Sequence, residues 1–308
     1  MRPSSPAPAA DLRGKFDCSV SLLCWGYNEE ELIEGFFDKA FGLLDAVASD
    51  FEIVFVDDGS TDSTGALADA YARKEPRLRV LHNGTNRNVG YSCSRAIGAA
   101  QKEFLFWQTV DWSYDLTHLR IFLELLKHYD VVQGIRPTPI RLLSHIPILK
   151  SIYRVNSRSD SLAKGLVSLG NYYLLRLLFG LDFHDFQNIT FYPTPLIQSV
   201  RLKGDSSFIN PECLFRAYER GARFIEVPIG FLPRAAGRAK GTRLTSIVRS
   251  VRDILSAWVA WGLRFRSLHG RGAANRRIHR VAEPFWLDEP VLELVIPLFK
   301  EYRPRGIS

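Results

Sequence analysis

The chain has 308 residues, of which 46% are hydrophobic, so it is long and apolar enough to bury a substantial core. Its net charge of +7 favours a partner rich in phosphate, such as a nucleotide, a nucleic acid or an anionic lipid surface, without choosing among them. The 4 cysteines show neither CxxC spacing nor a dense framework, which argues against a zinc site or a disulfide scaffold.

Charged side chains interrupt the most apolar windows, so no segment is expected to cross a bilayer. Residues 1–14 carry prolines among small side chains and are expected to form a flexible tail rather than a signal peptide. These features predict a cytoplasmic protein.

The N-terminal half alternates short apolar runs with longer helix-like stretches. Strands are expected at residues 18–24, 51–56, 78–82, 104–107 and 131–134, and helices at residues 30–47, 63–73, 90–100 and 116–127. This alternation predicts an α/β fold with a mostly parallel sheet flanked by helices. No GxGxxG or GxxxxGK[ST] motif follows these strands, which argues against a dinucleotide dehydrogenase or a P-loop enzyme.

The C-terminal half has a more helical pattern. Helical stretches are expected at residues 146–181, 208–221 and 246–266, with a strand at residues 223–227. We expect residues 15–242 to form the main domain, and residues 243–308 to form an amphipathic helix followed by an appendage.

The helix expected at residues 246–266 has a single apolar stripe with spacings of three and four residues. Its members are Ile247, Val251, Ile254, Trp258, Trp261 and Phe265. The stripe suits either packing against the body of the protein or contact with an anionic lipid surface, and buried area alone does not decide between them.

The first candidate site lies where the second predicted strand ends in Asp57 and Asp58. Ligands of open α/β sheets bind outside the carboxyl ends of the strands. At the end of the first strand, Tyr27 and Glu29 are expected to face the same crevice, and Asn28 is expected to cap the following helix. Aromatic and carboxylate side chains together suit a pocket for a base and a ribose, so these five residues are predicted to bind a nucleoside.

These segments resemble the signatures of inverting GT-A glycosyltransferases, which use nucleotide sugars. The matching motifs are Tyr27-Asn-Glu-Glu30, Val56-Asp-Asp-Gly-Ser-Thr-Asp62 and Asn88-Val-Gly90. Later motifs are similar to those of the dolichol-phosphate mannosyltransferase and polyprenyl-phosphate glycosyltransferase branch of glycosyltransferase family 2. They are Gly134-Ile-Arg136, Asp185-Phe-Gln-Asn188, Glu212 before Arg216-Ala217, Glu226-Val-Pro228 and Arg234-Ala-Ala-Gly-Arg-Ala-Lys240.

The resemblance covers about residues 17–242 and implies a GT-A type, Rossmann-like sheet. It also implies roles for side chains beyond the donor pocket. Asp185 and Glu212 fall at positions that face the sugar and the centre of the site, and Arg158 at a position near the acceptor phosphate. The cations expected to contact the donor phosphates are Arg136, Arg234, Arg238 and Lys240.

That family carries a metal-binding Asp-x-Asp after the fourth strand, and this sequence departs from it. Thr109 stands at the position of the first aspartate and Asp111 at that of the second. Mg²⁺ or Mn²⁺ would then be held by Asp111 together with the donor diphosphate. We expect weaker metal binding, because opposite unit charges about 4 Å apart attract by roughly 4 kcal/mol at an effective dielectric near 20.

The resemblance implies transfer of a sugar, with inversion, from a nucleoside-diphosphate sugar to a dolichyl or undecaprenyl phosphate. Such an acceptor is already an anion and needs positioning rather than a strong base. One alternative is a cytosolic glycosyltransferase that acts on a glycan or protein hydroxyl, with Asp185 or Glu212 as the base. Another is a nucleotide-binding scaffold without turnover.

The expected partners follow from these hypotheses. A lipid acceptor requires contact with an anionic membrane surface or a membrane protein, so peripheral attachment to the cytoplasmic face is expected. Nucleic acid is not an expected partner, because the sequence contains no recognition-helix motif and no aromatic-basic strand signature.

Overall fold

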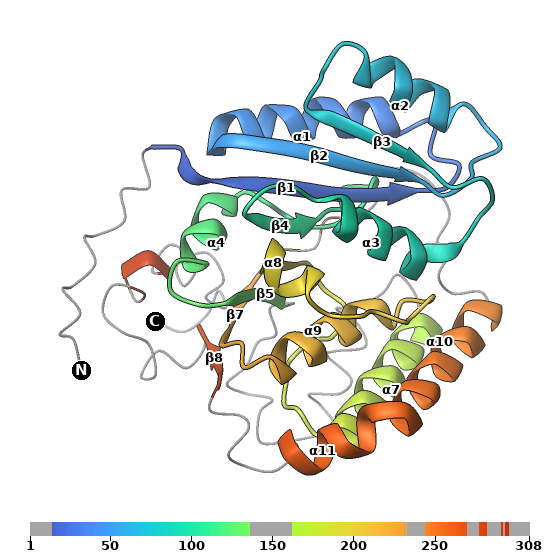
Figure 1. Ribbon diagram of the computed structural model, residues 1–308, viewed down its shortest axis with the longest axis vertical. Helices are drawn as coiled ribbons and strands as arrows, with labels where there is room; N and C mark the ends of the chain where they lie inside the picture. The colour runs from blue at the N-terminus through green and yellow to red at the C-terminus, as the bar shows by residue number, and fades with distance from the viewer. Residues whose placement is uncertain are drawn as a thin grey trace.

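The computed structural model describes residues 14–135, 162–230, 232, 244–269, 277–281, 291 and 293–295. Within them an 8-stranded sheet has the order β3-β2-β1-β4-β6-β5-β7-β8 (Figure 1). The strands are β1 (Phe16–Gly26), β2 (Ala48–Asp57), β3 (Leu78–His82), β4 (Phe104–Trp107), β5 (Val131–Ile135), β6 (Thr190–Pro193), β7 (Phe224–Pro228) and β8 (Ile278–Arg280). Among these described strands, only β6 pairs antiparallel with its neighbours, so the predicted mostly parallel sheet is confirmed.

Helices cover both faces of this sheet (Figure 1). They are α1 (Ile33–Val47), α2 (Thr64–Ala72), α3 (Asn88–Ala99), α4 (Leu119–Leu125), α7 (Leu162–Phe179), α8 (Thr194–Gln198), α9 (Ile209–Glu219), α10 (Leu244–Ala257) and α11 (Leu263–His269). Successive side chains of a strand point to opposite faces. On β1, Leu22 and Cys24 accordingly join the core under α1, α2 and α4, while Leu23 joins the core under α3, α7 and α9.

The predicted elements of the N-terminal half are confirmed, with ends that shift by a few residues. Three short elements were not predicted: β6, α8 and β8. Because β8 pairs with β7, residues 278–280 extend the sheet. The division of the chain at residue 242 stays a prediction.

The helix expected at residues 246–266 is longer than predicted and changes its winding in the middle. The π-helical turn η1 (Trp258–Gly262) joins α10 to α11. Ile254 and Phe265 are buried, and the ring centroid of Trp261 lies 5.0 Å from that of Phe179 on α7. These members of the predicted stripe therefore pack against the body of the protein. No helix in the described parts of the chain has the length and apolar character needed to cross a bilayer.

Gly90, in the first turn of α3, allows a close approach between two segments. A Cβ added at this position would lie 2.1 Å from the carbonyl oxygen of Gly204, and the Gly90 N–H donates to the Asp205 carbonyl at 3.2 Å. We expect Gly90→Ala to lower the free energy of unfolding by about 1–3 kcal/mol, because the backbone of the 204–205 segment must move.

Urea denaturation followed by circular dichroism measures this loss. Gly98→Ala is the matched control in the same helix, because a Cβ at Gly98 meets no atom within 4 Å. That change should leave stability unchanged or raise it by up to about 1 kcal/mol through helix propensity. Equal stabilities for the two variants would contradict the close contact.

Candidate active site

The loops after four strands meet at one edge of the sheet. The register pairs Gly26 at the end of β1 with Asp57 at the end of β2, and Asp57 with His82 at the end of β3. Trp107, which ends β4, pairs with Leu23, three residues before the end of β1. The segments that begin at Tyr27, Asp58, Asn83 and Gln108 therefore leave the sheet side by side. They form the ligand-binding edge expected of an open α/β sheet.

Left-handed backbone conformations occur in each of these four loops. Non-glycine residues with positive φ are Asn28 after β1 (53°), Asn88 after β3 (70°) and Trp112 after β4 (52°), and Gly59 after β2 has a φ of 72°. Such conformations cost free energy in side-chain-bearing residues and concentrate at functional sites. Their placement around one edge supports a binding site there.

The loops after β1 and β2 are joined by hydrogen bonds. The Thr61 N–H donates to Asn28 Oδ1 at 2.8 Å, and the Glu29 N–H donates to Thr64 Oγ1 at 2.8 Å. The prediction that Asn28 caps a helix is wrong, because α1 begins only at Ile33 and Asn28 instead binds the β2 loop. The donor-binding roles of Tyr27, Asn28 and Glu29 stay predictions.

Asp57 is buried and holds the start of its own loop. Its Oδ1 accepts the Ser60 N–H at 3.0 Å, and its Oδ2 lies 3.0 Å from His82 Nδ1. His82 Nε2 lies 3.1 Å from Asp69 Oδ1. The hydrogen bond with Asp57, with a smaller contribution from Asp69, raises the pKa of His82 above 6.5. Asp57 therefore stabilises the loop, and its contact with a donor stays a prediction.

The pKa of His82 tests this arrangement. We expect Asp57→Asn to lower it more than Asp69→Asn, because the bond with Asp57 contributes more. Since the folded pKa is raised, protonated His82 stabilises the fold fully below its unfolded pKa of 6.5, and this contribution is lost as pH rises through the folded pKa. NMR titration of the imidazole measures the pKa of His82 in the native chain and in both variants. A larger fall in Asp69→Asn would show that Asp57 is not the dominant partner.

Asp58 is fixed by donors from the next loop and helix. Its Oδ1 accepts from Asn83 Nδ2 at 2.7 Å, from the Arg87 N–H at 2.9 Å and from Ser92 Oγ at 3.0 Å. The sequence interpretation did not include Asn83 or Ser92. A signal for Asn83 was present, since it is the polar residue directly after β3 and so lies at the same sheet edge.

The loop after β4 is folded around the Gln108 side chain. Gln108 Oε1 accepts the Thr109 N–H at 2.9 Å, and Gln108 Nε2 donates to the Tyr114 carbonyl at 2.8 Å. Thr109 Oγ1 accepts the Ser113 N–H at 3.0 Å, while Ser113 Oγ donates to Asp111 Oδ1 at 2.6 Å. Thr109 thus closes the loop that presents Asp111. No group of three His, Cys, Asp or Glu residues suited to a metal occurs among the described residues.

Two predicted basic segments connect to this loop through described neighbours. The Leu232 N–H donates to the Ser113 carbonyl at 2.9 Å, and the Ile229 N–H donates to the Ile135 carbonyl at 2.9 Å. Leu232 therefore lies beside the Asp111 loop, and the end of β5 is bonded to the segment that leads to it. The predicted cations themselves lie outside the described residues: Arg136, Arg158, Arg234, Arg238 and Lys240.

Asp185 lies at the same edge of the sheet. The antiparallel strand β6 begins at Thr190, which pairs with Gln133 near the carboxyl end of β5. The Gln133 side-chain amide donates to the Asp185 carbonyl, and Asp185 Oδ1 accepts the Phe186 N–H at 2.9 Å. Its predicted contact with the sugar stays a prediction.

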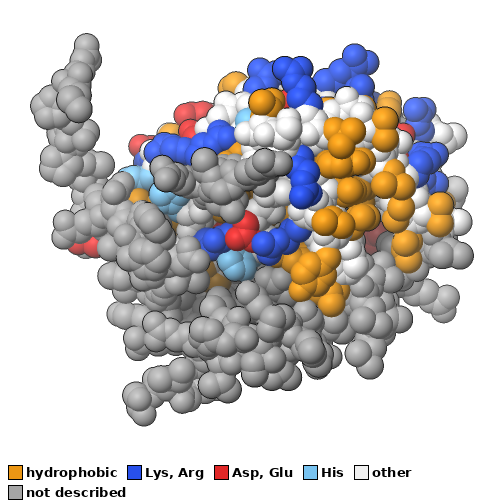
Figure 2. Space-filling model, turned by 90° about the horizontal axis from the view of Figure 1, so that it is seen from below, with side chains coloured by type: hydrophobic (Ala, Val, Ile, Leu, Met, Phe, Trp, Pro, Cys, Tyr) orange, Lys and Arg blue, Asp and Glu red, His pale blue; other side chains and the backbone are white. Residues whose placement is uncertain are grey.

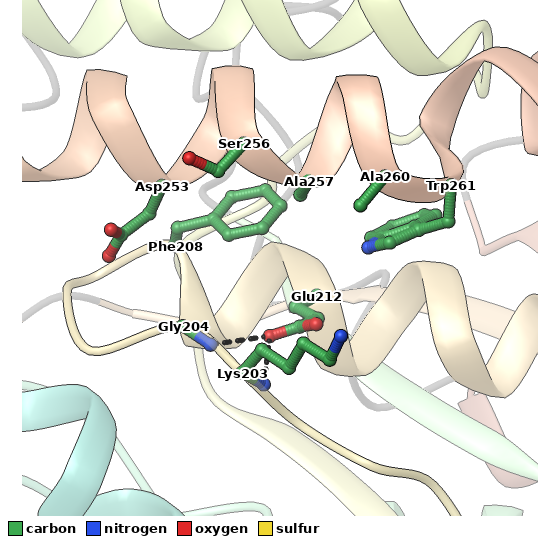
Figure 3. Close-up of a pocket in the computed structure, with 9 residues that line it drawn as sticks. All are labelled: Lys203, Gly204, Phe208, Glu212, Asp253, Ser256, Ala257, Ala260 and Trp261. Carbon is green, nitrogen blue, oxygen red and sulfur yellow. Dashed lines mark hydrogen bonds between the residues drawn. The ribbon is translucent and has the colours of Figure 1, made fainter.

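Glu212 lines a pocket of about 220 Å³ between α9 and α10 (Figure 3). Its Oε2 accepts the Lys203 N–H at 3.0 Å and the Gly204 N–H at 2.8 Å, whereas Oε1 is buried with no hydrogen-bond partner. Burial raises the pKa of Glu212 despite these donors. Phe208 and Trp261 are among the other residues that line the pocket. The neighbouring Asp205 carbonyl accepts the Gly90 N–H of α3 at 3.2 Å. The predicted place of Glu212 at the centre of the site stays a prediction.

Comparison with known proteins gives a family and several relatives. The model described as Glycosyl transferase family 2 matches residues 26–177. The glycosyltransferase AglD of Haloferax volcanii is 27% identical over 86% of this chain, which spans 40% of the length of AglD. The undecaprenyl-phosphate mannosyltransferase of Micrococcus luteus is 25% identical over 70% of this chain and 84% of its own. The polyprenol monophosphomannose synthase of Mycolicibacterium smegmatis is 25% identical over 81% of this chain and 89% of its own.

Solved structures show the same fold at lower identity. Glucosyl-3-phosphoglycerate synthase of Mycobacterium tuberculosis in complex with UDP has a TM-score of 0.55 and 17% identity, covering 84% of this chain and 86% of that one. The complex of that enzyme with Mn²⁺, UDP and glucosyl-3-phosphoglycerate has a TM-score of 0.53 and 17% identity, covering 84% and 87%. The predicted GT-A type α/β fold is thereby confirmed.

Proposed function

Since the chain belongs to glycosyl transferase family 2, we propose that it transfers a sugar from a nucleoside-diphosphate sugar to a polyprenyl phosphate. One observation carries this proposal. The Asp111 loop lies at the edge where β1, β2 and β3 end, and it is hydrogen-bonded to Leu232, two residues before the predicted phosphate ligand Arg234. The names of two relatives, from M. luteus and M. smegmatis, support the acceptor class.

In this proposal the donor lies across the loops after β1, β2 and β4. Tyr27, Asn28 and Glu29, with Asp57 and Asp58, form the nucleoside end of the site. The diphosphate lies beside Asp111, where Arg136, Arg234, Arg238 and Lys240 neutralise the charge that develops as it leaves.

A divalent cation is part of the proposal because the oxygen ligands that this site offers suit one. Mg²⁺ commonly takes one or two protein carboxylates and completes its coordination with water and substrate phosphate oxygens. Asp111 supplies one carboxylate, and Thr109 supplies none. Bound there, Mg²⁺ or Mn²⁺ would add positive charge beside the departing diphosphate.

The acceptor phosphate provides the nucleophile. One of its oxygens forms a bond to the anomeric carbon while the bond from that carbon to the diphosphate breaks, and attack from the opposite side inverts the configuration. Arg158 holds the acceptor phosphate, and Asp185 and Glu212 orient the sugar, so the residues of the site act mainly by positioning. Because the acceptor is a lipid, the reaction takes place at the cytoplasmic face of a membrane.

A hydroxyl acceptor on a soluble glycan or protein is a second candidate. Burial raises the pKa of Glu212, and a raised pKa brings a carboxylate closer to the value that suits a general base at neutral pH. In this case Glu212→Gln should abolish transfer at every pH. With a lipid phosphate acceptor, the same change should reduce transfer only moderately.

Radiolabelled nucleotide sugars, offered with a short-chain polyprenyl phosphate or with a soluble oligosaccharide, test the two candidates. Labelled glycolipid that forms only with the polyprenyl phosphate supports the main proposal. Labelled oligosaccharide supports the second. If the chain binds donor nucleotide in calorimetry and yields no product with either acceptor, with or without Mn²⁺, it is a scaffold and both candidates are wrong.

A further inference from the structure

The long helical segment α10–η1–α11 has a second apolar surface that was not predicted and that shares Val251 with the predicted stripe. The inward stripe with Ile254 and Phe265 is already covered by the body of the protein. On another side of the segment, residues at spacings of three and four are exposed and form what we call the apolar ridge. Its members and their exposed fractions are Val248 (60%), Val251 (39%), Leu255 (47%), Val259 (75%) and Leu263 (57%).

The ridge belongs to a broader exposed apolar area. Tyr173 and Leu177 on the neighbouring helix α7 are exposed by 47% and 66%. Figure 2 shows hydrophobic side chains gathered on the right of the molecule, the side on which Figure 1 places α7 and α10. Contiguous exposed apolar areas mark surfaces that bind a partner or a membrane.

The charges beside the ridge identify the kind of partner. Residues 244–269 contain one carboxylate, Asp253, whose side chain is 11% exposed and accepts the Ser206 N–H at 3.1 Å. The arginines of the segment are Arg249, Arg252, Arg264 and Arg266. Arg252 Nη2 lies 3.5 Å from Asp253 Oδ1, but its side chain is 67% exposed, and the sequence of α7 contains no aspartate or glutamate. An apolar ridge with cationic borders fits an anionic lipid surface, whereas a second copy would oppose like charges.

Hydrogen bonds fix this segment to the edge that carries the candidate active site. Arg249 on α10 donates to the side chain of Asn88, the first residue of α3. The hydroxyls of Ser207 and Ser250 lie 2.9 Å apart. The loop just before α3 also supplies the Arg87 N–H that binds Asp58. The N-terminal half of the ridge therefore lies close to the loops of the site.

We propose that the apolar ridge inserts into the headgroup region of an anionic leaflet and holds the strand-end loops beside the lipid phosphates. The link to the acceptor rests on the proposed function, whereas the lipid contact itself does not. Insertion buries aliphatic side chains, and arginines at the border add attraction that salt weakens. This arrangement brings a lipid acceptor to the site.

Vesicle sedimentation tests the lipid contact with the full chain. Vesicles of phosphatidylcholine, with and without phosphatidylglycerol, separate apolar from anionic recognition. We expect binding to the anionic vesicles only. The double variant Leu255→Asp with Val259→Asp, which we call the ridge variant, should bind these vesicles at least about tenfold more weakly than the native chain. Arg252→Glu should also weaken binding, by about fivefold at low salt.

Leu268→Asp is the matched control in the same helical segment. Leu268 is 64% exposed and lies five residues beyond Leu263, about 140° around the helix. The control should bind vesicles like the native chain, and thermal unfolding checks that all variants fold. Equal losses for the control and the ridge variant would overturn the proposal. The proposal would also be overturned if the native chain did not bind anionic vesicles and sedimented as an oligomer, while the ridge variant sedimented as a monomer.

A transfer assay separates the two proposals. The ridge variant should keep native activity on a water-soluble, short-chain polyprenyl phosphate and lose at least about tenfold with the acceptor embedded in vesicles. Vesicle binding by the native chain, together with no transfer to either acceptor, would contradict the proposed function and leave the lipid contact standing. Transfer to the vesicle acceptor at the native rate by the ridge variant would contradict the ridge proposal alone.

Discussion

Asp111→Asn should lower the rate of sugar transfer by about 100- to 1,000-fold at saturating donor, as expected for losing one group that stabilises transition-state charge. Asp111 is the carboxylate that the loop after β4 presents at the sheet edge, and Thr109 does not supply a second one. The asparagine side chain has nearly the same size and still accepts the Ser113 hydroxyl, which lies 2.6 Å from Asp111 Oδ1. The loss should therefore come from charge rather than from misfolding. Initial rates at several Mn²⁺ concentrations measure it.

Thr109→Asp is the matched change in the opposite direction. Thr109 Oγ1 accepts the Ser113 N–H at 3.0 Å, and an aspartate oxygen can accept the same bond. The added carboxylate should lower the Mn²⁺ concentration needed for half-maximal rate by about tenfold or more, because of its attraction to the cation. A native rate for Asp111→Asn, together with an unchanged Mn²⁺ requirement in Thr109→Asp, would show that this loop does not hold the metal.

The position of the site edge could be predicted because it follows from local patterns. Buried strands of five or six apolar residues are recognisable without neighbours, and their carboxyl ends converge in any parallel sheet. Asp57 and Asp58 were thus placed at this edge before any register was known, and the family resemblance added Asp111. The observed register places the loops that carry these residues side by side, and their joint role in one site stays a prediction.

Contacts between distant segments could not be predicted in the same way. Asn28 satisfied the composition rule for a helix cap, but its left-handed backbone directs its amide to Thr61, 33 residues away. The four residues of β6 were missed because the segment is short and ends at Pro193. Only pairing with β4 and β5 makes this segment a strand.

The long helical segment α10–η1–α11 shows another limit of prediction from sequence. Its sequence has an apolar stripe, and periodicity alone does not reveal which of two apolar surfaces meets the protein body. The aromatic cluster of Phe179, Phe215 and Phe265 determines that choice, and its members come from three different helices. The exposed ridge became visible only after this inward side was known.

Glu226→Gln should lower the free energy of unfolding by about 3–5 kcal/mol, the usual cost of breaking a buried ion pair. Glu226 on β7 is fully buried, and its Oε2 lies 2.8 Å from His184 Nδ1 and 2.9 Å from Arg280 Nε. Its Oε1 accepts the His184 N–H at 2.6 Å. The variant removes the buried carboxylate that Arg280 on β8 meets, while Arg280 Nη2 still lies 3.3 Å from Asp182 Oδ2. Chemical denaturation at neutral pH measures the loss.

Glu219→Gln is the control for an ion pair in solvent. Glu219 Oε2 lies 2.9 Å from Arg216 Nη1, but its side chain is 42% exposed, so the change should cost no more than about 1 kcal/mol. A similar cost for the two variants would mean that burial does not strengthen the Glu226 contacts.

The stability difference at Glu226 should also depend on pH in a defined direction. Burial by itself would raise the pKa of Glu226, but the charge and hydrogen bonds of His184, followed by the charge of Arg280, lower it below 4.5. Because the folded pKa is lowered, the contribution of Glu226 is fully present above the unfolded pKa and is lost as pH falls through the folded pKa. The native chain and Glu226→Gln should therefore converge in stability at acidic pH. A difference that stays constant from neutral to acidic pH would mean that Glu226 is not charged in the folded protein.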